Sequence, residues 1–231
     1  MTDGRPGAVL FDFFGTLVPA GPEESWDEQM RRLAEPLGLP VDVVGDGFTR
    51  TRPQRMAGTL DFATSIQQIC AGAGVPVTDA QVEAAEAARI ASMRRWMTPR
   101  DVTLPTLRRL RDAGVPLALV SDCSPDVEDI WPTTPMAAYF PVAVFSSAMG
   151  TRKPDPVMYA TAYEALGVAP EHCMYVGDGN SNELTGAAAL GIRTIHLDAE
   201  RPERPGADYE GASWTGERIT SLAELPALLD L

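Results

Sequence analysis

Three apolar runs along the chain, each too short for a buried helix, end in polar or acidic residues. A short continuous apolar run bounded by turn residues is typical of a buried strand in a parallel sheet, and helical stretches between such strands are typical of α/β folds. Because the carboxyl ends of parallel strands lie at one edge of the sheet, we expect the polar residues to converge there. The runs are residues 8–11 followed by Asp12, residues 117–120 followed by Ser121, and residues 173–176 followed by Gly177 and Asp178.

The stretch between the first two runs is the longest connection. About a hundred residues separate Leu17 from the second run, which is far more than a simple strand connection needs. Apolar residues at helical spacing predict helices near residues 26–33 and 62–70. Residues 78–81 (Thr-Asp-Ala-Gln) form a capping-box pattern, which predicts the start of a helix that runs toward Trp96. This insertion is large enough for an α-helical cap over the sheet edge.

The pattern therefore predicts an α/β fold with two parts. The parallel-sheet core comprises residues 1–18 and 99–231, and the α-helical cap comprises residues 19–98. A chain of 231 residues with 45% hydrophobic residues can bury one core and a small cap. Near the end, residues 198–216 predict an irregular surface segment and residues 221–229 a short closing helix.

The basic residues single out one position. Of the 19 lysines and arginines, only Lys153 is a lysine, and a compact ammonium suits a narrow anionic site better than a guanidinium does. Pro154 disfavours a helical conformation at Lys153, Asp155 can cap the next helix, and Pro156 suits its first turn. Lys153 is thus expected on a loop at a helix start, where anions bind.

Together these residues indicate phosphoryl chemistry. Three carboxylates, those of Asp12, Asp178 and Glu183, repel one another unless a hard cation is present, and their oxygen atoms suit Mg²⁺. A phosphoryl group would be held by this cation, by Lys153 and by the Ser121 hydroxyl while Asp12 attacks it in line. Each residue alone has an ordinary structural explanation, but their order and spacing along the chain favour one shared site.

The motifs resemble those of the haloacid dehalogenase superfamily of hydrolases over residues 8–197. The family pattern has a nucleophilic Asp in Asp-x-Asp-Gly-Thr, a Ser or Thr that ends a second strand, a Lys ahead of a helix, and a Gly-Asp followed by a second acid. The resemblance implies a Rossmann-like core, a cap that closes over the substrate, a covalent aspartyl intermediate and, in most members, Mg²⁺. It also implies that the main-chain carbonyl of Phe14 contacts the metal. The matching positions here are Asp12, Ser121, Lys153, Asp178 and Glu183.

Phe14 departs from the phosphatase pattern. Phosphatases of that superfamily have an Asp at this position, which protonates the leaving oxygen and then activates water. Such general acid and base catalysis commonly raises the reaction rate by a factor of about 10² to 10⁴. Haloacid dehalogenases have an aromatic residue at this position and bind no metal, so Phe14 resembles them. Two other positions differ: those enzymes typically lack an acid at the position of Asp178, and they have Ser-Asn where this chain has Ser121-Asp122. We expect Phe14 and Asp122, beside the nucleophile, to contact the substrate.

Three functions follow from this mixture. The first is a magnesium-dependent phosphatase that acts on a small phosphorylated metabolite through an aspartyl phosphate. The second is a metal-free 2-haloacid dehalogenase with the same nucleophile, and the third is a degenerate member that binds a phosphorylated ligand without turnover. In the cap, Arg52 and Arg55 could bind a substrate carboxylate or phosphate, in a segment that Pro53 breaks and that ends at Gly58.

The composition of the chain indicates which classes of binding partner to expect. A net charge of −13 disfavours nucleic acid, and neither a signal peptide nor a membrane span is expected, so we expect a cytoplasmic enzyme with a small anionic substrate. The cysteines, Cys70, Cys123 and Cys173, have neither disulfide nor zinc spacing, and an inert thiol is expected at Cys123. His196, near the end of an apolar run, is expected to be structural.

Overall fold

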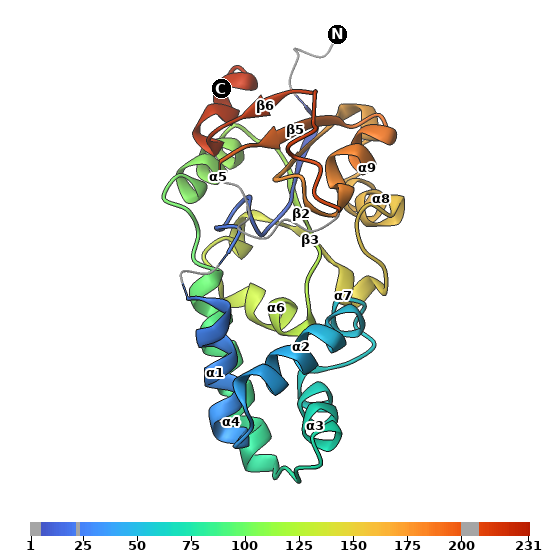
Figure 1. Ribbon diagram of the computed structural model, residues 1–231. Helices are drawn as coiled ribbons and strands as arrows, with labels where there is room; N and C mark the ends of the chain where they lie inside the picture. Colours follow the sequence, from blue (N-terminus) through green and yellow to red (C-terminus); the bar gives the residue numbers. More distant parts are fainter. Residues whose placement is uncertain (1–5, 22–23, 200–207) are drawn as a thin grey trace.

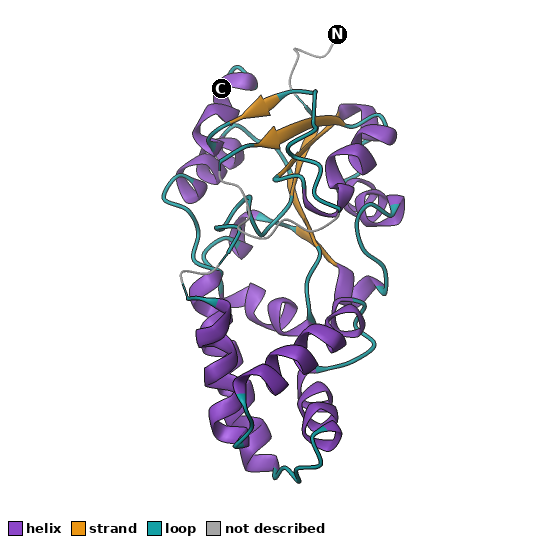
Figure 2. Cartoon of the chain, in the orientation of Figure 1, coloured by secondary structure: helices purple, strands orange, loops and turns teal. Residues whose placement is uncertain are grey.

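The fold comes from a computed structural model, which describes residues 6–21, 24–199 and 208–231. A parallel sheet flanked by helices lies at one end of the molecule, and a group of four helices lies at the other (Figure 1). Figure 2 shows that the strands gather at the first end and that the second is built from helices and loops alone. The four helices are α1 (Trp26–Leu37), α2 (Val41–Met56), α3 (Phe62–Gly72) and α4 (Asp79–Trp96). We call them the helical insert.

The sheet of the described residues has six strands, all parallel. They are β1 (Ala8–Phe11), β2 (Leu117–Ser121), β3 (Val142–Phe145), β4 (Cys173–Gly177), β5 (Arg193–Leu197) and β6 (Arg218–Ile219). Their order is β3-β2-β1-β4-β5-β6, so β1 lies between β2 and β4. Leu10 of β1 is level with Ala118 of β2 and with Tyr175 of β4. The expected parallel α/β architecture is confirmed, and the carboxyl ends of the strands share one edge.

Helices cover both faces of the sheet. They are α5 (Thr103–Asp112), α6 (Pro125–Ile130), α7 (Ser146–Met149), α8 (Pro156–Ala165), α9 (Glu183–Ala189) and α10 (Leu225–Leu228), with short 3₁₀ turns at Trp131–Thr133, Ala137–Tyr139, Pro170–His172, Asn180–Asn182 and Leu222–Glu224. Val9 and Phe11 pack with side chains of α5 and α10, whereas Ala8 and Leu10 pack with those of α8 and α9. Because both faces of β1 are buried, its sequence is a continuous apolar run.

The helical insert has an apolar core of its own. Apolar side chains from all four helices form it, among them Met30 of α1, Phe48 of α2, Ile66 of α3 and Val82 of α4. The predicted capping box is present: the main-chain N–H of Gln81 donates to the Thr78 hydroxyl, and the Gln81 side chain accepts from the N–H of Thr78. The helices expected near residues 26–33 and 62–70 and toward Trp96 are confirmed.

Helix α2 differs from the expectation that Pro53 breaks its segment. The helix continues through Pro53 to Met56. Proline removes the main-chain donor that would otherwise bond Thr49 O, but here it lies in the last turn, where this loss does not interrupt a longer helix. Two side chains add bonds to other carbonyls of the helix. The Thr51 hydroxyl donates to Gly47 O at 2.9 Å, and the Arg55 guanidinium donates to Phe48 O at 3.0 Å.

The end of the chain matches the expectation only in part. Residues 221–229 fold as a 3₁₀ turn followed by α10, close to the short closing helix that was predicted. Residues 208–216 are irregular, and the rest of the expected irregular segment, residues 200–207, lies outside the described residues. The two-residue strand β6 was not predicted. The boundaries between core and cap at residues 18/19 and 98/99 stay a prediction.

Among the described helices, none combines the length and the apolar character that crossing a membrane requires.

Candidate active site

Polar residues that end the central strands gather at one edge of the sheet. Asp12 directly follows β1, Ser121 is the last residue of β2, and Asp178 directly follows β4. All three residues are buried. Because β1 lies between β2 and β4, the strand order alone brings these three positions to neighbouring points of the edge.

Lys153 reaches this edge from the loop before α8. Its ammonium donates to Asp12 Oδ1 at 2.5 Å and to Glu183 Oε2 at 2.5 Å, and only 2% of its side chain is exposed. As the sequence indicated, Asp155 caps α8 by accepting from the N–H of Val157. The main-chain N–H of Lys153 donates to Asp122 Oδ1 at 3.0 Å, which ties the lysine loop to the residue after β2.

Asp12, Asp178 and Glu183 form a buried carboxylate cluster. One oxygen atom from each of them lies within 4.8 Å of the others. Hard oxygen donors at such spacing, in a buried setting, fit the preference of Mg²⁺ for carboxylates. The residues present therefore fit a divalent cation.

The electrostatics of the cluster favour such a cation. Burial, the largest effect, and the charges of neighbouring carboxylates together raise the pKa of Asp12, Asp178 and Glu183 to about 7 each. Burial lowers the pKa of Lys153, but the charges of Asp12 and Glu183 outweigh it and hold that pKa well above its usual value. One ammonium against three carboxyl groups leaves negative charge that a divalent cation would balance.

Glycines give the carboxylates room to approach. A Cβ at Gly177 would lie 2.2 Å from Glu183 Oε1, and a Cβ at Gly15 would lie 2.1 Å from Asp178 Oδ2. Gly15 also has a φ of 88°, a conformation that other residues rarely adopt. Gly15, near Asp12, and Gly177, before Asp178, thus serve the packing of the carboxylate cluster itself.

Ser121 and Asp122 keep unused hydrogen-bonding capacity. Among the described residues, neither the Ser121 hydroxyl nor Asp122 Oδ2 has a hydrogen-bond partner, although both atoms are buried. A buried hydroxyl without a partner is uncommon, because leaving it unpaired costs about 1–3 kcal/mol. Ser121 at the end of β2 is therefore well suited to donate to a ligand bound beside Asp12.

Phe14 lies in an aromatic cluster that joins core and insert. Its ring centroid is 4.7 Å from that of Phe13 and 4.4 Å from that of Trp96, the last residue of α4. The Trp96 indole N–H donates to Pro19 O at 3.0 Å, which fixes this end of the insert to the segment after Asp12. The side chain of Phe14 contributes no proton donor or acceptor here.

Sequence reasoning missed two hydroxyl groups of the site. Thr16 donates to Asp12 Oδ2 at 2.9 Å, so Thr16 and Lys153 together fix both oxygens of that carboxylate. Tyr175 of β4 donates to Glu183 Oε2 at 2.8 Å and lies 3.4 Å from the Lys153 ammonium. Thr16 could have been found, because it belongs to the same motif as Asp12. Tyr175 is hidden within an apolar strand, where it looks like any core residue.

The two candidate arginines of the insert differ in their exposure to solvent. Arg52 is exposed, whereas Arg55 is buried, with its guanidinium 3.6 Å from the centre of the Phe48 ring and bonded to Thr51 and Phe48 within α2. Burial, with the nearby charge of Arg89, lowers the pKa of Arg55 to about 10. Their role as substrate ligands stays a prediction.

His196 and Cys123 behave as structural residues. The ring Nε2 of buried His196 lies 3.1 Å from the main-chain oxygen of Asp178, so it steadies the loop after β4, as expected for a structural histidine. Burial raises the pKa of the Cys123 thiol to about 12, which agrees with an unreactive thiol.

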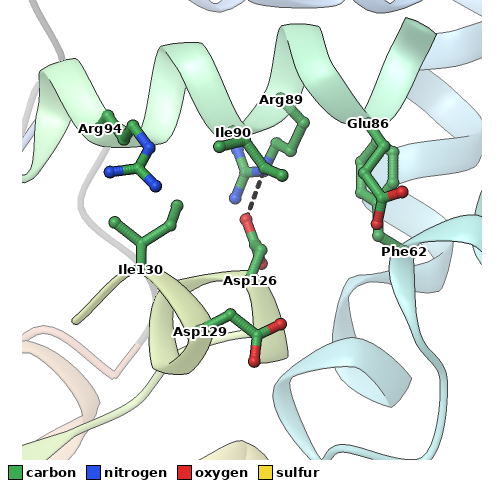
Figure 3. Close-up of a pocket in the computed structure, with 8 residues that line it drawn as sticks. All are labelled: Phe62, Glu86, Arg89, Ile90, Arg94, Asp126, Asp129 and Ile130. Carbon is green, nitrogen blue, oxygen red and sulfur yellow. Dashed lines mark hydrogen bonds and ion pairs between the residues drawn. The ribbon is translucent and has the colours of Figure 1, made fainter. Parts of the chain in front are cut away.

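A hollow of about 110 Å³ lies between α4 of the insert and α6 of the core (Figure 3). The Arg89 guanidinium crosses it and donates to Asp126 Oδ2 at 2.8 Å; both side chains are nearly buried. Its lining contains both charge signs and none of the Asp12 cluster. It is lined by Phe62, Glu86, Arg89, Ile90, Arg94, Asp126, Asp129 and Ile130.

Known proteins are similar to this chain in sequence or in fold. The glyceraldehyde 3-phosphate phosphatase of Methanopyrus kandleri is 28% identical over 198 residues, which cover 82% of this chain and 83% of that protein. A HAD phosphatase from Thermococcus onnurineus superposes with a TM-score of 0.64 at 22% identity, covering 96% of this chain and 97% of the other. A 2-haloacid dehalogenase from Pseudomonas syringae pv. Tomato DC3000 superposes with a TM-score of 0.68 at 20% identity, with coverage of 96% and 97%.

At these identities the two solved structures establish a shared fold and leave the chemistry open. The family assignment rests on sequence: the model of the haloacid dehalogenase-like hydrolases matches residues 6–191, which is most of the chain and includes each of the motifs at Asp12, Ser121, Lys153 and Asp178. The chain belongs to the haloacid dehalogenase-like hydrolases.

Proposed function

We propose that this hydrolase is a magnesium-dependent phosphatase that acts on a small phosphorylated metabolite through an aspartyl phosphate on Asp12. The observation that carries the proposal is the buried cluster of Asp12, Asp178 and Glu183 around the Lys153 ammonium. A cluster of this kind suits a bound cation and a phosphoryl group. Without a metal, its carboxylates would repel a carboxylate substrate. The similarity to a glyceraldehyde 3-phosphate phosphatase supports the substrate class.

Mg²⁺ would be held by the carboxylates of Asp12, Asp178 and Glu183 and by the main-chain carbonyl of Phe14. Bound there, it would supply positive charge that offsets the charge of the phosphoryl oxygens and of the carboxylates. The chain's own residues would then bind and orient the substrate. Lys153 and the unpaired Ser121 hydroxyl are placed to donate to phosphoryl oxygens.

The covalent step uses Asp12. One carboxylate oxygen of Asp12 forms a bond to phosphorus while the bond from phosphorus to the leaving oxygen breaks, and the leaving group departs with that electron pair. Water then attacks phosphorus, which releases inorganic phosphate and restores the carboxylate. Hydrogen bonds from Thr16 and Lys153 hold the nucleophile in one orientation, so less order must be created during the reaction.

Phe14 limits which leaving groups depart easily. In the first step an alkoxide needs a proton, but the side chain at position 14 is a phenyl ring packed on Trp96. A nitrophenolate or a carboxylate leaves as a stable anion and needs no proton. We therefore expect activated aryl and acyl phosphates to react faster than alkyl phosphates, and the aspartyl phosphate to hydrolyse slowly.

Phe14→Asp should raise magnesium-dependent hydrolysis of alkyl phosphates about tenfold or more, because it supplies the missing acid and base. Hydrolysis of nitrophenyl phosphate should change much less. The measurement is kcat/KM for an alkyl and for a nitrophenyl phosphate in wild type and variant.

Phe14→Asn is the matched control, because it has the size and polarity of Asp but does not transfer a proton. A gain with Asp and none with Asn supports the account. If wild type already hydrolyses alkyl phosphates at an ordinary enzymatic rate and Phe14→Asp brings no gain, another group supplies the proton and the role given to Phe14 is wrong.

One observation favours a second candidate, a 2-haloacid dehalogenase. An aromatic residue occupies position 14, and a 2-haloacid dehalogenase shares the fold. In that reaction Asp12 would attack carbon, the carbon–halogen bond would break and halide would leave with the electron pair. Water would then hydrolyse the ester at the carboxyl carbon of Asp12. The carboxylate cluster weighs against this alternative, because it would repel a carboxylate substrate.

A further inference from the structure

A segment distant in sequence lies against the loop that carries Asp178 and Glu183. Residues 208–211, which we call the clasp, belong to the irregular region before β6. The N–H of Asn182 in the loop donates to the main-chain oxygen of Asp208 at 2.8 Å. A Cβ on Gly179 would lie 2.7 Å from main-chain atoms of Gly211, so loop and clasp are in tight contact.

Glu210 binds both ends of this loop. Its main-chain N–H donates to Gly179 O at 2.8 Å, one residue after Asp178. Its carboxylate accepts from the main-chain N–H groups of Leu184 at 2.6 Å and Thr185 at 2.9 Å, and also from the Thr185 hydroxyl. These groups belong to the first turn of α9, whose first residue is Glu183. Glu210 thus holds the loop at both ends, at Gly179 and at the first turn of α9.

The loop needs such support, because its backbone is strained. Ser181 has a φ of 60° and Asn182 a φ of 49°, both in the left-handed region that non-glycine residues rarely adopt. Such conformations persist where surrounding contacts impose them. Within the loop, the N–H of Gly179 donates to Glu183 Oε1 at 2.9 Å, so a relaxed loop would also take one hydrogen bond from the Glu183 carboxylate.

We propose that Glu210 is a positioning residue that holds Asp178 and Glu183 in the arrangement that binds the divalent cation. The inference rests on the proposed function for the metal itself. Glu210 bonds Gly179 and the first turn of α9, so it would act on the Asp12 cluster through the loop. Groups that orient metal ligands from behind typically change metal affinity by about 10- to 100-fold when removed.

The test compares Glu210 with a second glutamate in the same chemical role. Glu224 accepts from the main-chain N–H groups of Thr220 and Ser221, each at 2.9 Å, and from the Thr220 hydroxyl at 2.9 Å, in the capping box that precedes α10. Glu224→Ala is therefore matched to Glu210→Ala in the kind of bonds lost. The measurements are the Mg²⁺ dissociation constant by calorimetry and hydrogen exchange of the main-chain amides.

We expect Glu210→Ala to weaken Mg²⁺ binding about tenfold or more and to speed exchange of the amides of residues 179–185. Glu210→Gln, whose amide oxygen can still accept hydrogen bonds, should recover part of both losses. Glu224→Ala should leave Mg²⁺ affinity unchanged. Wild-type affinity in a folded Glu210→Ala protein, or an equal loss in Glu224→Ala, would overturn the proposal.

Failure of the proposed function has a different signature. If wild type binds no Mg²⁺, the proposed function fails and the metal role of Glu210 fails with it. Hydrogen exchange then still shows whether Glu210 holds the loop, because it requires no metal. Unchanged exchange in Glu210→Ala, together with normal Mg²⁺ binding by wild type, removes the positioning role alone.

Discussion

Asp12→Asn abolishes turnover, with an expected loss of at least about 10⁴-fold in kcat, which corresponds to about 5.5 kcal/mol of transition-state stabilisation. The physical reason is that an amide oxygen is a poor nucleophile, while Asn keeps the shape of the side chain and one oxygen that can still accept from Lys153. The measurement is steady-state release of phosphate, with circular dichroism to check that the variant folds.

Asp198→Asn is the matched control for Asp12→Asn. Asp198 also follows a strand of the same sheet, β5, but its carboxylate pairs with Arg218 at 3.0 Å instead of joining the cluster. It should keep nearly full activity. Full activity of a folded Asp12→Asn protein would remove both the phosphatase and the dehalogenase reading, because both use this carboxylate.

Removal of the metal has the second large effect. We expect EDTA to stop wild-type phosphate release, and Mg²⁺ to restore it. Asp178→Asn and Glu183→Gln should each weaken Mg²⁺ binding by about tenfold or more in calorimetry, because each takes a charged oxygen ligand from the cluster. Asp198→Asn again serves as the control and should bind Mg²⁺ as wild type does.

If the protein is a dehalogenase, its activity should not depend on a metal. Halide release from a 2-haloacid that continues undiminished in EDTA, with no phosphate release in Mg²⁺, would favour that reaction. The cytoplasmic location expected from the sequence is independent of either outcome and stays a prediction.

The sequence predicted the parts of the fold and the site that follow from local patterns. Buried parallel strands produce continuous apolar runs, so the positions of Asp12, Ser121 and Asp178 at strand ends could be read directly. The position of Lys153 on a loop could also be predicted from its neighbours, because Pro154 and Asp155 define the start of α8. One general rule, that parallel strands end at the same edge, then placed these residues together.

The remaining features depend on contacts that no local pattern contains. Helix α2 continues through Pro53 because the helix ends at Met56, so the missing main-chain donor falls in its last turn, and this end point was not evident from the sequence. Glu210 meets α9 across about 25 residues of sequence, and Tyr175 differs from a core residue only in where its hydroxyl points. Strand β6 has two residues, too few for any alternation to register.

Phe14 shows that fold similarity alone does not identify the reaction. The fold and the carboxylate cluster are compatible with a phosphorylated substrate, yet under the proposed function a single aromatic residue beside Asp12 would change which leaving groups depart easily. Fold similarity does not decide this, since phosphatases and dehalogenases share the architecture. The species that forms on Asp12 would therefore distinguish the two proposed reactions.

The most direct test of that chemistry is to trap the covalent intermediate on Asp12. Wild type is mixed with Mg²⁺ and an acyl phosphate, quenched in acid, and the peptide that contains Asp12 is examined by mass spectrometry. One parallel sample contains the acyl phosphate with EDTA, and another contains a 2-haloacid with EDTA. The account predicts a phosphoryl group on Asp12 in Mg²⁺, none in EDTA and none in Asp12→Asn. An ester of the 2-haloacid carbon on Asp12, formed in EDTA, with no phosphorylated Asp12 in any sample, would contradict it.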